Sequence, residues 1–251
     1  GKPRELEFGV TDDDAFAVGL ACGGTIRVLV EPVGGAMPEA LLRDLVAARA
    51  ARQPVAYVAD LETGDRRLDV DGHAERFRLD RSGFDDEAPR RFVAIHNPPL
   101  RLIVVGGVHI AQALLPMARI AGYDPVVVDP REAFASPERF PDTTLSHDWP
   151  DEALDALGLD TRTALVLLTH DPKLDDPALH RALRSACFYI GALGSTRTHA
   201  KRVARLEQAG FTTDEIARIH APVGLDLGAA SPPEIAVSII AQMTRVLRRG
   251  S

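Results

Sequence analysis

Arg101-Leu-Ile-Val-Val-Gly-Gly-Val-His-Ile-Ala111 joins an apolar run to a glycine turn and then to a helical pattern. The run to Gly106 is typical of a buried strand, and the pattern from about His109 to Ala121 predicts a helix. We expect this helix to bury Ile110, Ala113, Leu114 and Met117. A buried strand that passes through glycines into a helix is the repeating unit of a parallel sheet.

Further strand and helix signals follow downstream of this unit. Apolar runs predict three more strands, at Pro125–Asp129, Thr163–His170 and Ala186–Gly191. Two capping boxes, Thr212 with Glu215 and Ser231 with Glu234, predict the starts of helices near 213–219 and 232–248. We therefore predict an α/β fold for residues 98–251: a Rossmann-like parallel sheet with helices on both faces.

Residues 1–97 have a different pattern, which predicts a smaller α+β domain. Strands are expected at Thr25–Val33 and Pro54–Ala59, with a helix at Pro38–Arg49 between them. The charged stretch from Leu61 to Arg91 predicts meandering antiparallel strands, for example at Glu75–Leu79. Because the chain starts at Gly1 without a methionine, we expect this domain to be incomplete. A homodimer is expected, since the domain is small for a core of its own.

Composition and charge limit the classes of function. The 251 residues carry a formal net charge of -7, so nucleic acid is not expected as a partner. Cys22 and Cys187 lie far apart and the 8 histidines show no metal-binding spacing, so no disulfide framework or preformed metal site is expected. No apolar run reaches the roughly 18 residues of a membrane span, and no signal sequence opens the chain. We expect a soluble cytoplasmic protein.

The turn after the first strand partly matches the glycine pattern of dinucleotide-binding folds. Gly106 and Ala111 fit the first and third positions, but Val108 occupies the second, where a side chain should obstruct the phosphate. Asp129 ends the next strand, where an acid that binds ribose usually lies. The parallel sheet of such a fold is therefore expected, whereas NAD(P) binding in the usual pose is disfavoured by Val108.

Three later turns carry polar groups at the edge where open α/β sheets bind ligands. His170 and Asp171 end one strand, and they either contact a ligand or only turn the chain. The turn Gly191-Ala-Leu-Gly-Ser-Thr-Arg197 suits an oxyanion or phosphate, although Ser195 can equally be a helix cap. Asp226, in the loop from Gly224, is either a ligand contact or a turn residue.

A single thiol stands beside a glycine bend in the first domain, in Ala21-Cys22-Gly23-Gly24. Cysteine is both a soft metal ligand and a nucleophile. Without a neighbouring histidine or second cysteine, the residues alone favour a small buried apolar role for Cys22.

Six motifs in order along almost the whole chain resemble the XdhC/CoxI family. They are Gly19-Leu-Ala-Cys-Gly-Gly-Thr25, Val105-Gly-Gly-Val-His-Ile-Ala-Gln112, Thr169-His-Asp171, Tyr189-Ile-Gly-Ala-Leu-Gly-Ser195, Pro222-Val-Gly-Leu-Asp-Leu-Gly228 and Pro233-Glu-Ile-Ala-Val-Ser-Ile239. Members of that family are maturation factors for molybdenum hydroxylases such as xanthine dehydrogenase and carbon monoxide dehydrogenase.

The resemblance implies a chaperone, rather than an enzyme, that protects the molybdenum cofactor (molybdopterin) and inserts it into an apo-hydroxylase, with a cysteine desulfurase as a further partner. It also makes Cys22 the leading candidate for a contact with molybdenum. The cofactor-binding residues it implies are Cys22, Gly23, Gly24, Gly106, Gly107, His109, Asp129, Arg131, His170, Asp171, Gly191, Gly194, Ser195, Arg197, Gly224 and Asp226. Two other hypotheses stay open: an NAD(P)-dependent oxidoreductase and a purely structural adaptor.

Overall fold

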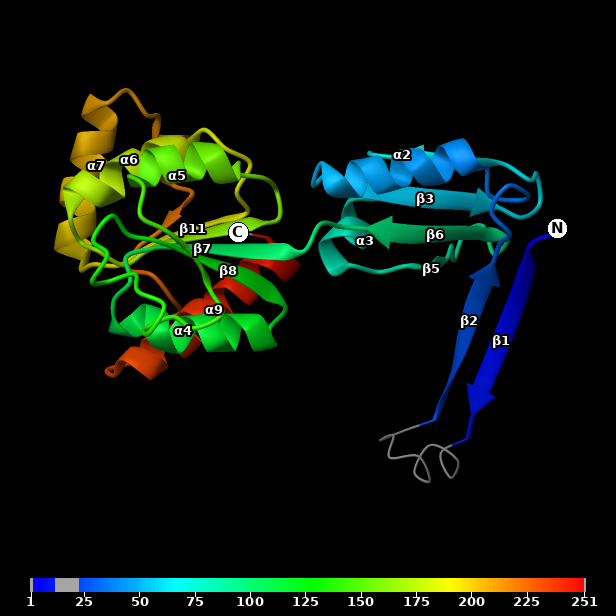
Figure 1. Ribbon diagram of the computed structural model, residues 1–251, viewed down its shortest axis with the longest axis horizontal. Coiled ribbons are helices and arrows are strands. Elements are labelled where there is room, and N and C mark those ends of the chain that lie inside the picture. The colour runs from blue at the N-terminus through cyan, green and yellow to red at the C-terminus, as the bar shows by residue number, and fades with distance from the viewer. Residues whose placement is uncertain (1, 12–22, 251) are drawn as a thin grey trace. The chain divides into compact units, whose positions relative to one another are not determined.

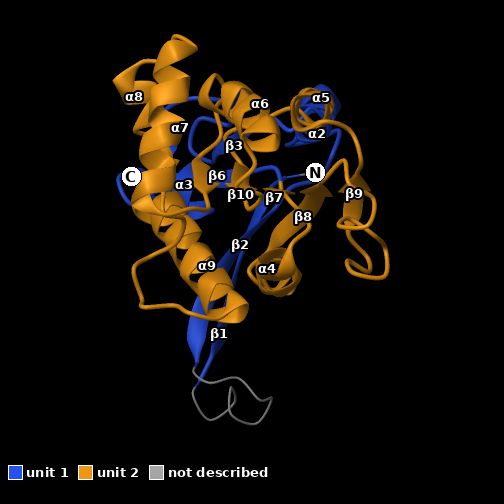
Figure 2. Ribbon diagram, turned by 90° about the vertical axis from the view of Figure 1, so that its left-hand side faces the viewer, with its two compact units in different colours: residues 1–98 blue, residues 99–251 orange. Residues whose placement is uncertain are grey.

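The chain forms two compact units in the computed structural model, which describes residues 2–11 and 23–250. Unit 1 comprises residues 1–98 and unit 2 comprises residues 99–251 (Figure 2). The predicted boundary, after residue 97, lies one residue before this division. None of the helices within the described ranges is both long and apolar enough to cross a membrane.

Unit 2 is built on a parallel sheet of six strands, which confirms the predicted Rossmann-like fold. In spatial order the strands are β12 (Ile219–His220), β11 (Tyr189–Ala192), β10 (Thr163–Leu167), β7 (Leu100–Val105), β8 (Tyr123–Val128) and β9 (Thr144–Ser146). The order reverses between β7 and β10, because the chain runs outward from β7 to β9 and then returns to β7's other side.

Helices cover both faces of this sheet, as predicted (Figure 1). They are α4 (His109–Ile120), α5 (Pro150–Leu157), α6 (Pro172–Leu183), α7 (Thr196–Gln208), α8 (Thr213–Ile216) and α9 (Pro232–Arg249). Alternate strand residues supply two separate cores, since successive side chains point to opposite faces. Leu102 and Val104 join the core beneath α4 and α9, whereas Ile103 and Val105 join the core beneath α5 and α6.

Local signals account for the ends of several of these elements. Both predicted capping boxes are present, at Thr212 and Glu215 before α8 and at Ser231 and Glu234 before α9. The strand expected to reach His170 ends at Leu167, and the backbone of His170, with a φ of 60°, is no longer extended.

The first helix of unit 2 buries a slightly different face from the one predicted. Leu114 is fully buried as expected, together with Ala111, Leu115 and Ala118. Ile110, Ala113 and Met117 are only partly buried against the same core. The buried face of α4 therefore lies about one residue farther along the helix than the face predicted from the sequence.

Unit 1 contains an antiparallel sheet with the order β4 (Arg66–Asp69), β3 (Val55–Asp60), β6 (Arg91–His96) and β5 (Gly83–Phe84). It also contains α2 (Glu39–Ala50), α3 (Ala74–Leu79) and a two-stranded ribbon of β1 (Arg4–Val10) and β2 (Gly24–Val30). The sheet's small core consists of Ala56, Val58 and Val93.

The strand expected at Glu75–Leu79 was wrong, because this segment is helix α3. The alternation of Phe77 and Leu79 with charged residues resembled a strand pattern. In the folded chain Phe77 packs against the small core of unit 1, and one helical turn is enough to bring it there.

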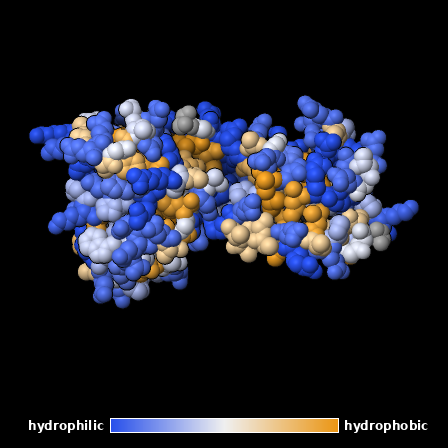
Figure 3. Space-filling model, turned by 90° about the horizontal axis from the view of Figure 1, so that it is seen from above, coloured by the Kyte–Doolittle hydropathy of each residue, from blue (hydrophilic) through white to orange (hydrophobic). Residues whose placement is uncertain are grey.

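The ribbon of β1 and β2 has one apolar and one polar face. Leu6 is paired with Val28 and Phe8 with Ile26, so these side chains share one face, as period-two alternation requires. All four are exposed, and Phe8 and Ile26 retain 52% and 62% of their accessible surface. In the view of Figure 3 the surface is mainly hydrophilic, with apolar groups in patches on both units.

Candidate functional site

The sheet of unit 2 gathers most of the predicted site residues at one edge, since the carboxyl ends of parallel strands lie side by side. Gly106, Gly107 and His109 follow β7; Asp129 and Arg131 follow β8; His170 and Asp171 follow β10; Gly194, Ser195 and Arg197 follow β11; and Gly224 and Asp226 follow β12. Gly191 lies within β11 itself. Gly23 and Gly24 belong to unit 1, and Cys22 lies outside the described residues.

The turn after β7 is packed closely against its neighbours. A Cβ atom on Gly106, whose φ is +107°, would lie 2.7 Å from Cγ2 of Thr169. A Cβ atom on Gly107 would lie 2.4 Å from the carbonyl oxygen of Phe134. Val108 is the N-cap residue of α4 and packs against the core. The side-chain directions of Gly106 and Gly107 are therefore filled by groups of this chain, so both positions require glycine.

Asp129 is engaged in the same packing. It has no exposed surface, and its carboxylate accepts hydrogen bonds from the Gly107 amide at 3.0 Å and from Nε and Nη2 of Arg131, both at 2.8 Å. Burial opposes the ionisation of Asp129, but these hydrogen bonds outweigh it and hold its pKa below the ordinary value. This carboxylate is thus positioned to fix the turn rather than to meet a ribose.

One cavity at the carboxyl edge lies beside β11 and β12 and has a volume of about 550 Å³. Its walls come from the β11–α7 turn, the loop after β12 and the first turns of α9. The lining residues are Leu193, Thr196, Pro222, Val223, Gly224, Leu225, Asp226, Leu227, Gly228, Ala229, Ile235 and Ser238. This volume is within the range of about 300–1,000 Å³ that is usual for small-molecule sites.

The loop after β12 is held onto α9 by close contacts at Gly224. Its amide donates to Oε1 of Gln242 at 2.8 Å, and the same oxygen accepts the hydroxyl of Tyr189 at 2.6 Å. A Cβ atom at position 224, where φ is +95°, would lie 2.2 Å from Oγ of Ser238. A glycine is therefore required for this loop to form one wall of the cavity.

A second cavity of about 240 Å³ lies on the other side of the β11–α7 turn. His170 and Pro172 line it from the β10–α6 turn and Asp175 from α6, and α7 contributes Arg197, Thr198, Lys201, Arg202 and Arg205. Of these, only His170 and Arg197 were predicted from the sequence. The basic residues of α7 were missed because a helix with charged residues at this spacing is usually a solvated face.

Asp175 and Arg202 form a buried ion pair at the floor of this basic cavity. Their side chains are 3% and 2% exposed, and Nη2 of Arg202 lies 3.3 Å from Oδ2 of Asp175. The Thr169 hydroxyl donates to Asp175 at 2.5 Å. Burial raises the pKa of the Asp175 carboxyl, whereas Thr169 and Arg202 act in the opposite direction.

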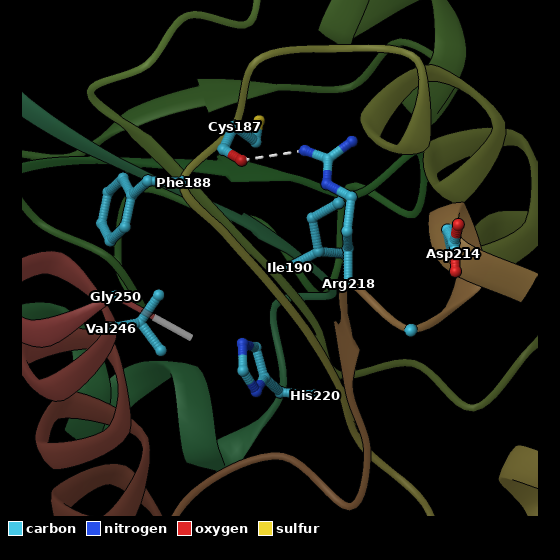
Figure 4. A pocket seen from close by; sticks show the side chains of 9 residues that line it. Cys187, Phe188, Ile190, Asp214, Arg218, His220, Val246 and Gly250 are labelled. Carbon is cyan, nitrogen blue, oxygen red and sulfur yellow. Dashed lines mark hydrogen bonds between the residues drawn. The ribbon is translucent and has the colours of Figure 1, made fainter.

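A third cavity, of about 470 Å³, lies beside the residues that precede β11 (Figure 4). Arg218 donates there to the carbonyl of Cys187 at 3.0 Å, and His220, whose ring stacks on Tyr189, faces the space from β12. Burial lowers the pKa of His220 and raises that of the Cys187 thiol.

Because ligands of such sheets bind at the carboxyl ends of strands, we place the candidate site at the two cavities beside the β11–α7 turn.

The fold and its carboxyl-edge cavities define unit 2 as a Rossmann-like domain. The family model of the XdhC Rossmann domain matches residues 102–243. The chain therefore belongs to the XdhC family.

Individual relatives agree with this assignment. The chain is 29% identical to the molybdenum cofactor insertion chaperone PaoD of Escherichia coli over 98% of its own length and 67% of that protein's. It is 32% identical to the uncharacterized protein YqeB of Escherichia coli over 62% of the chain. It is 29% identical, over 65% of the chain, to a Bacillus subtilis protein described as a probable xanthine dehydrogenase subunit.

Among solved structures, one described as a xanthine dehydrogenase from Bacillus halodurans covers 99% of the chain with a TM-score of 0.67 and 28% identity. The chain covers 76% of that structure. It covers only 29% of the length of YqeB and 48% of the length of the Bacillus subtilis protein.

Proposed function

We propose that this protein is a molybdenum-cofactor chaperone, which binds the cofactor, shields it from water and inserts it into a molybdenum hydroxylase. The observation that carries this proposal is the similarity to PaoD, a molybdenum cofactor insertion chaperone, over 98% of the chain. Both units fall within that similarity, so the proposal concerns the whole chain rather than the Rossmann-like unit alone.

The 550 Å³ cavity beside β11 and β12 is the proposed place of the pterin. Leu193, Leu225 and Ile235 offer apolar surface to the faces of a flat heterocycle. Thr196 and Asp226 offer hydrogen-bonding groups to its polar edges. A ligand held in this way would be removed from bulk water while it waits for transfer.

Cys22 is the proposed contact for the molybdenum atom, with Gly23 and Gly24 beside it. A thiolate is a soft ligand that suits such a metal.

The proposed recipient is an apo-hydroxylase of the xanthine dehydrogenase or carbon monoxide dehydrogenase type, and a cysteine desulfurase is the proposed source of sulfur for the bound cofactor. A cytoplasmic location is part of the same proposal.

We also propose that the protein is a homodimer and that the apolar face of the β1–β2 ribbon lies in its interface. Leu6, Phe8, Ile26 and Val28 form a continuous exposed apolar strip. A strip of this kind on a strand pair is typical of an association surface, because covering it removes apolar area from water.

An insertion assay tests the proposed function. An apo-hydroxylase is mixed with released cofactor, with and without this protein, and recovered hydroxylase activity is measured. We expect recovery to depend on the protein and to fall about tenfold for Leu227→Asp, because this exposed side chain of the cavity wall would lose its apolar contact with the bound ligand, at a cost on the order of 1.5 kcal/mol. The matched control is Val237→Asp, which alters an exposed residue of α9 outside the cavity. Equal recovery with and without the protein would refute the proposal.

A further inference from the structure

The side chain of Arg202 is almost completely buried and yet keeps two hydrogen-bond donors without an acceptor. Its Nη2 donates to the carbonyl of Leu193 at 3.0 Å and lies 3.3 Å from Asp175, but Nε and Nη1 have no partner among the described residues. Buried donors are nearly always satisfied, because an unmade hydrogen bond there is unfavourable. Arg202 lines the 240 Å³ basic cavity, where a bound anion would lie against its guanidinium group.

The charge around the cavity is suited to an anion. Arg197, Lys201 and Arg205 follow one another at intervals of four residues on α7, so their side chains share one face of the helix. Arg205 is neutralised by Asp176, with bonds of 2.5 and 2.8 Å. Within the part of the chain that the structure describes, no ion pair compensates Arg197 or Lys201.

Backbone geometry adds to this electrostatic preference. The cavity extends along α7 from Arg197 to Arg205, so only its part beside Arg197 and Thr198 lies at the helix N-terminus, where the aligned peptides favour negative charge. His170 adopts a φ of 60°, an uncommon conformation for a residue with a side chain, and a Cβ atom on Gly194 would lie 3.5 Å from its Nδ1. The β11–α7 turn therefore lies in contact with the imidazole of His170 at the rim of the cavity.

The size of the cavity indicates what part of a ligand it takes. At about 240 Å³ it is smaller than sites for whole small molecules, which usually begin near 300 Å³. The 550 Å³ cavity begins on the other side of the same turn, at Leu193 and Thr196. A ligand with a phosphorylated arm can therefore place its body in the larger cavity and its arm in the smaller one.

We propose that the basic cavity is a phosphoryl-binding subsite, in which Arg202 is the buried donor and Arg197 and Lys201 supply the uncompensated charge. The site takes a phosphate or diphosphate group. Its assignment to the phosphorylated arm of the molybdenum cofactor rests on the proposed function, whereas the anion site itself does not.

The first experiment uses inorganic phosphate and pyrophosphate as probes on the full chain, at constant ionic strength with chloride as the reference salt. Thermal unfolding and calorimetric titration measure binding, since a ligand of the folded state raises the melting temperature with its concentration. We expect saturable binding that weakens at least tenfold in Arg197→Glu/Lys201→Glu. Both side chains are exposed, so this variant should fold normally.

Two further variants make this result decisive. Arg249→Glu, an exposed charge reversal at the far end of α9, should bind phosphate like the wild type. Arg202→Met should also lose phosphate binding. If Arg202→Met does not fold, the phosphate binding of Arg197→Glu/Lys201→Glu still tests the proposed subsite. Absence of saturable binding in the wild type, or undiminished binding in Arg197→Glu/Lys201→Glu, would overturn the subsite.

A second experiment separates the sources of the phosphoryl group. The wild type and Arg197→Glu/Lys201→Glu are each mixed with molybdenum cofactor and passed through gel filtration. Loss of cofactor retention in the double variant supports the assignment to the cofactor's arm. Loss of phosphate binding with full cofactor retention would overturn that assignment and leave a site for free phosphate. If the wild type binds phosphate but retains no cofactor, the proposed function fails while the subsite stands.

Discussion

Gly106 and Thr169 pack against each other at the point where the strand order of unit 2 reverses, so closely that a Cβ atom on Gly106 would lie 2.7 Å from Cγ2 of Thr169. In many open α/β sheets this point is a crevice that receives a ligand. Here Thr169 fills the side-chain direction of Gly106, and two cavities lie farther along the same edge, on either side of the β11–α7 turn.

Gly106→Ala tests this packing. The new methyl group would meet both an unfavourable φ of +107° and the Thr169 side chain. Gly122→Ala is the matched control, because Gly122 has a φ of +86° with open space around it. We expect Gly106→Ala to lower the free energy of unfolding by about 2 kcal/mol more than Gly122→Ala does, which is the usual cost of overpacking. Equal losses in urea denaturation would show that the contact is not tight.

NADH should not bind in the usual dinucleotide pose. The amide of Gly107 donates to the buried carboxylate of Asp129, and Val108 occupies the second glycine position of the pattern. Titration of the protein with NADH, followed by nucleotide fluorescence, is expected to show no saturation at micromolar concentrations. Saturable binding that disappears on Asp129→Ala would contradict this expectation.

Asp129 should make the stability of unit 2 sensitive to acid. Its pKa is held below the ordinary value of 3.8, so the folded state binds a proton less readily than the unfolded state does. Its stabilisation is therefore complete above the unfolded value and is lost as the pH falls through that value toward the lower folded one. Asp129→Asn should cost about 2 kcal/mol at neutral pH. The melting temperature of Asp129→Asn should also fall less steeply with decreasing pH than that of the wild type. An equally steep fall in the variant would refute this role of Asp129.

The ribbon of unit 1 offers a test of self-association. Phe8→Ser with Ile26→Ser removes the two most exposed apolar side chains of its strip. We expect the double variant to shift from dimer toward monomer in light scattering coupled to gel filtration, because the interface loses apolar area. Glu7→Gln, on the polar face, is the control. A monomeric wild type would refute the proposed dimer outright.

The sequence predicted those parts of the fold that depend on local patterns. The apolar run at Thr163–Leu167 is buried at every residue, as a parallel strand covered on both faces must be. The capping boxes of α8 and α9 could also be recognised in the sequence, because each consists of two residues three positions apart. Glu75–Leu79 was misassigned because two apolar residues cannot distinguish a strand from one helical turn.

The candidate site was predictable only in part. His170 and Arg197 were found because they follow strands directly, and parallel strands place such residues together. Arg202 was not found, because its burial depends on Asp175, 27 residues earlier on another helix. Long-range pairing of this kind leaves no local signal, and Arg202 within α7 looks like an ordinary surface arginine in the sequence.

The central claim is that this protein holds the molybdenum cofactor as cargo. Its most direct test is the molybdenum content of the protein peak after incubation with the cofactor and gel filtration, measured by mass spectrometry. We expect molybdenum to elute with the wild-type protein in a fixed ratio near one per chain and to be lost from the protein peak in Cys22→Ser or Leu227→Asp. Molybdenum that elutes entirely with the small molecules would contradict it.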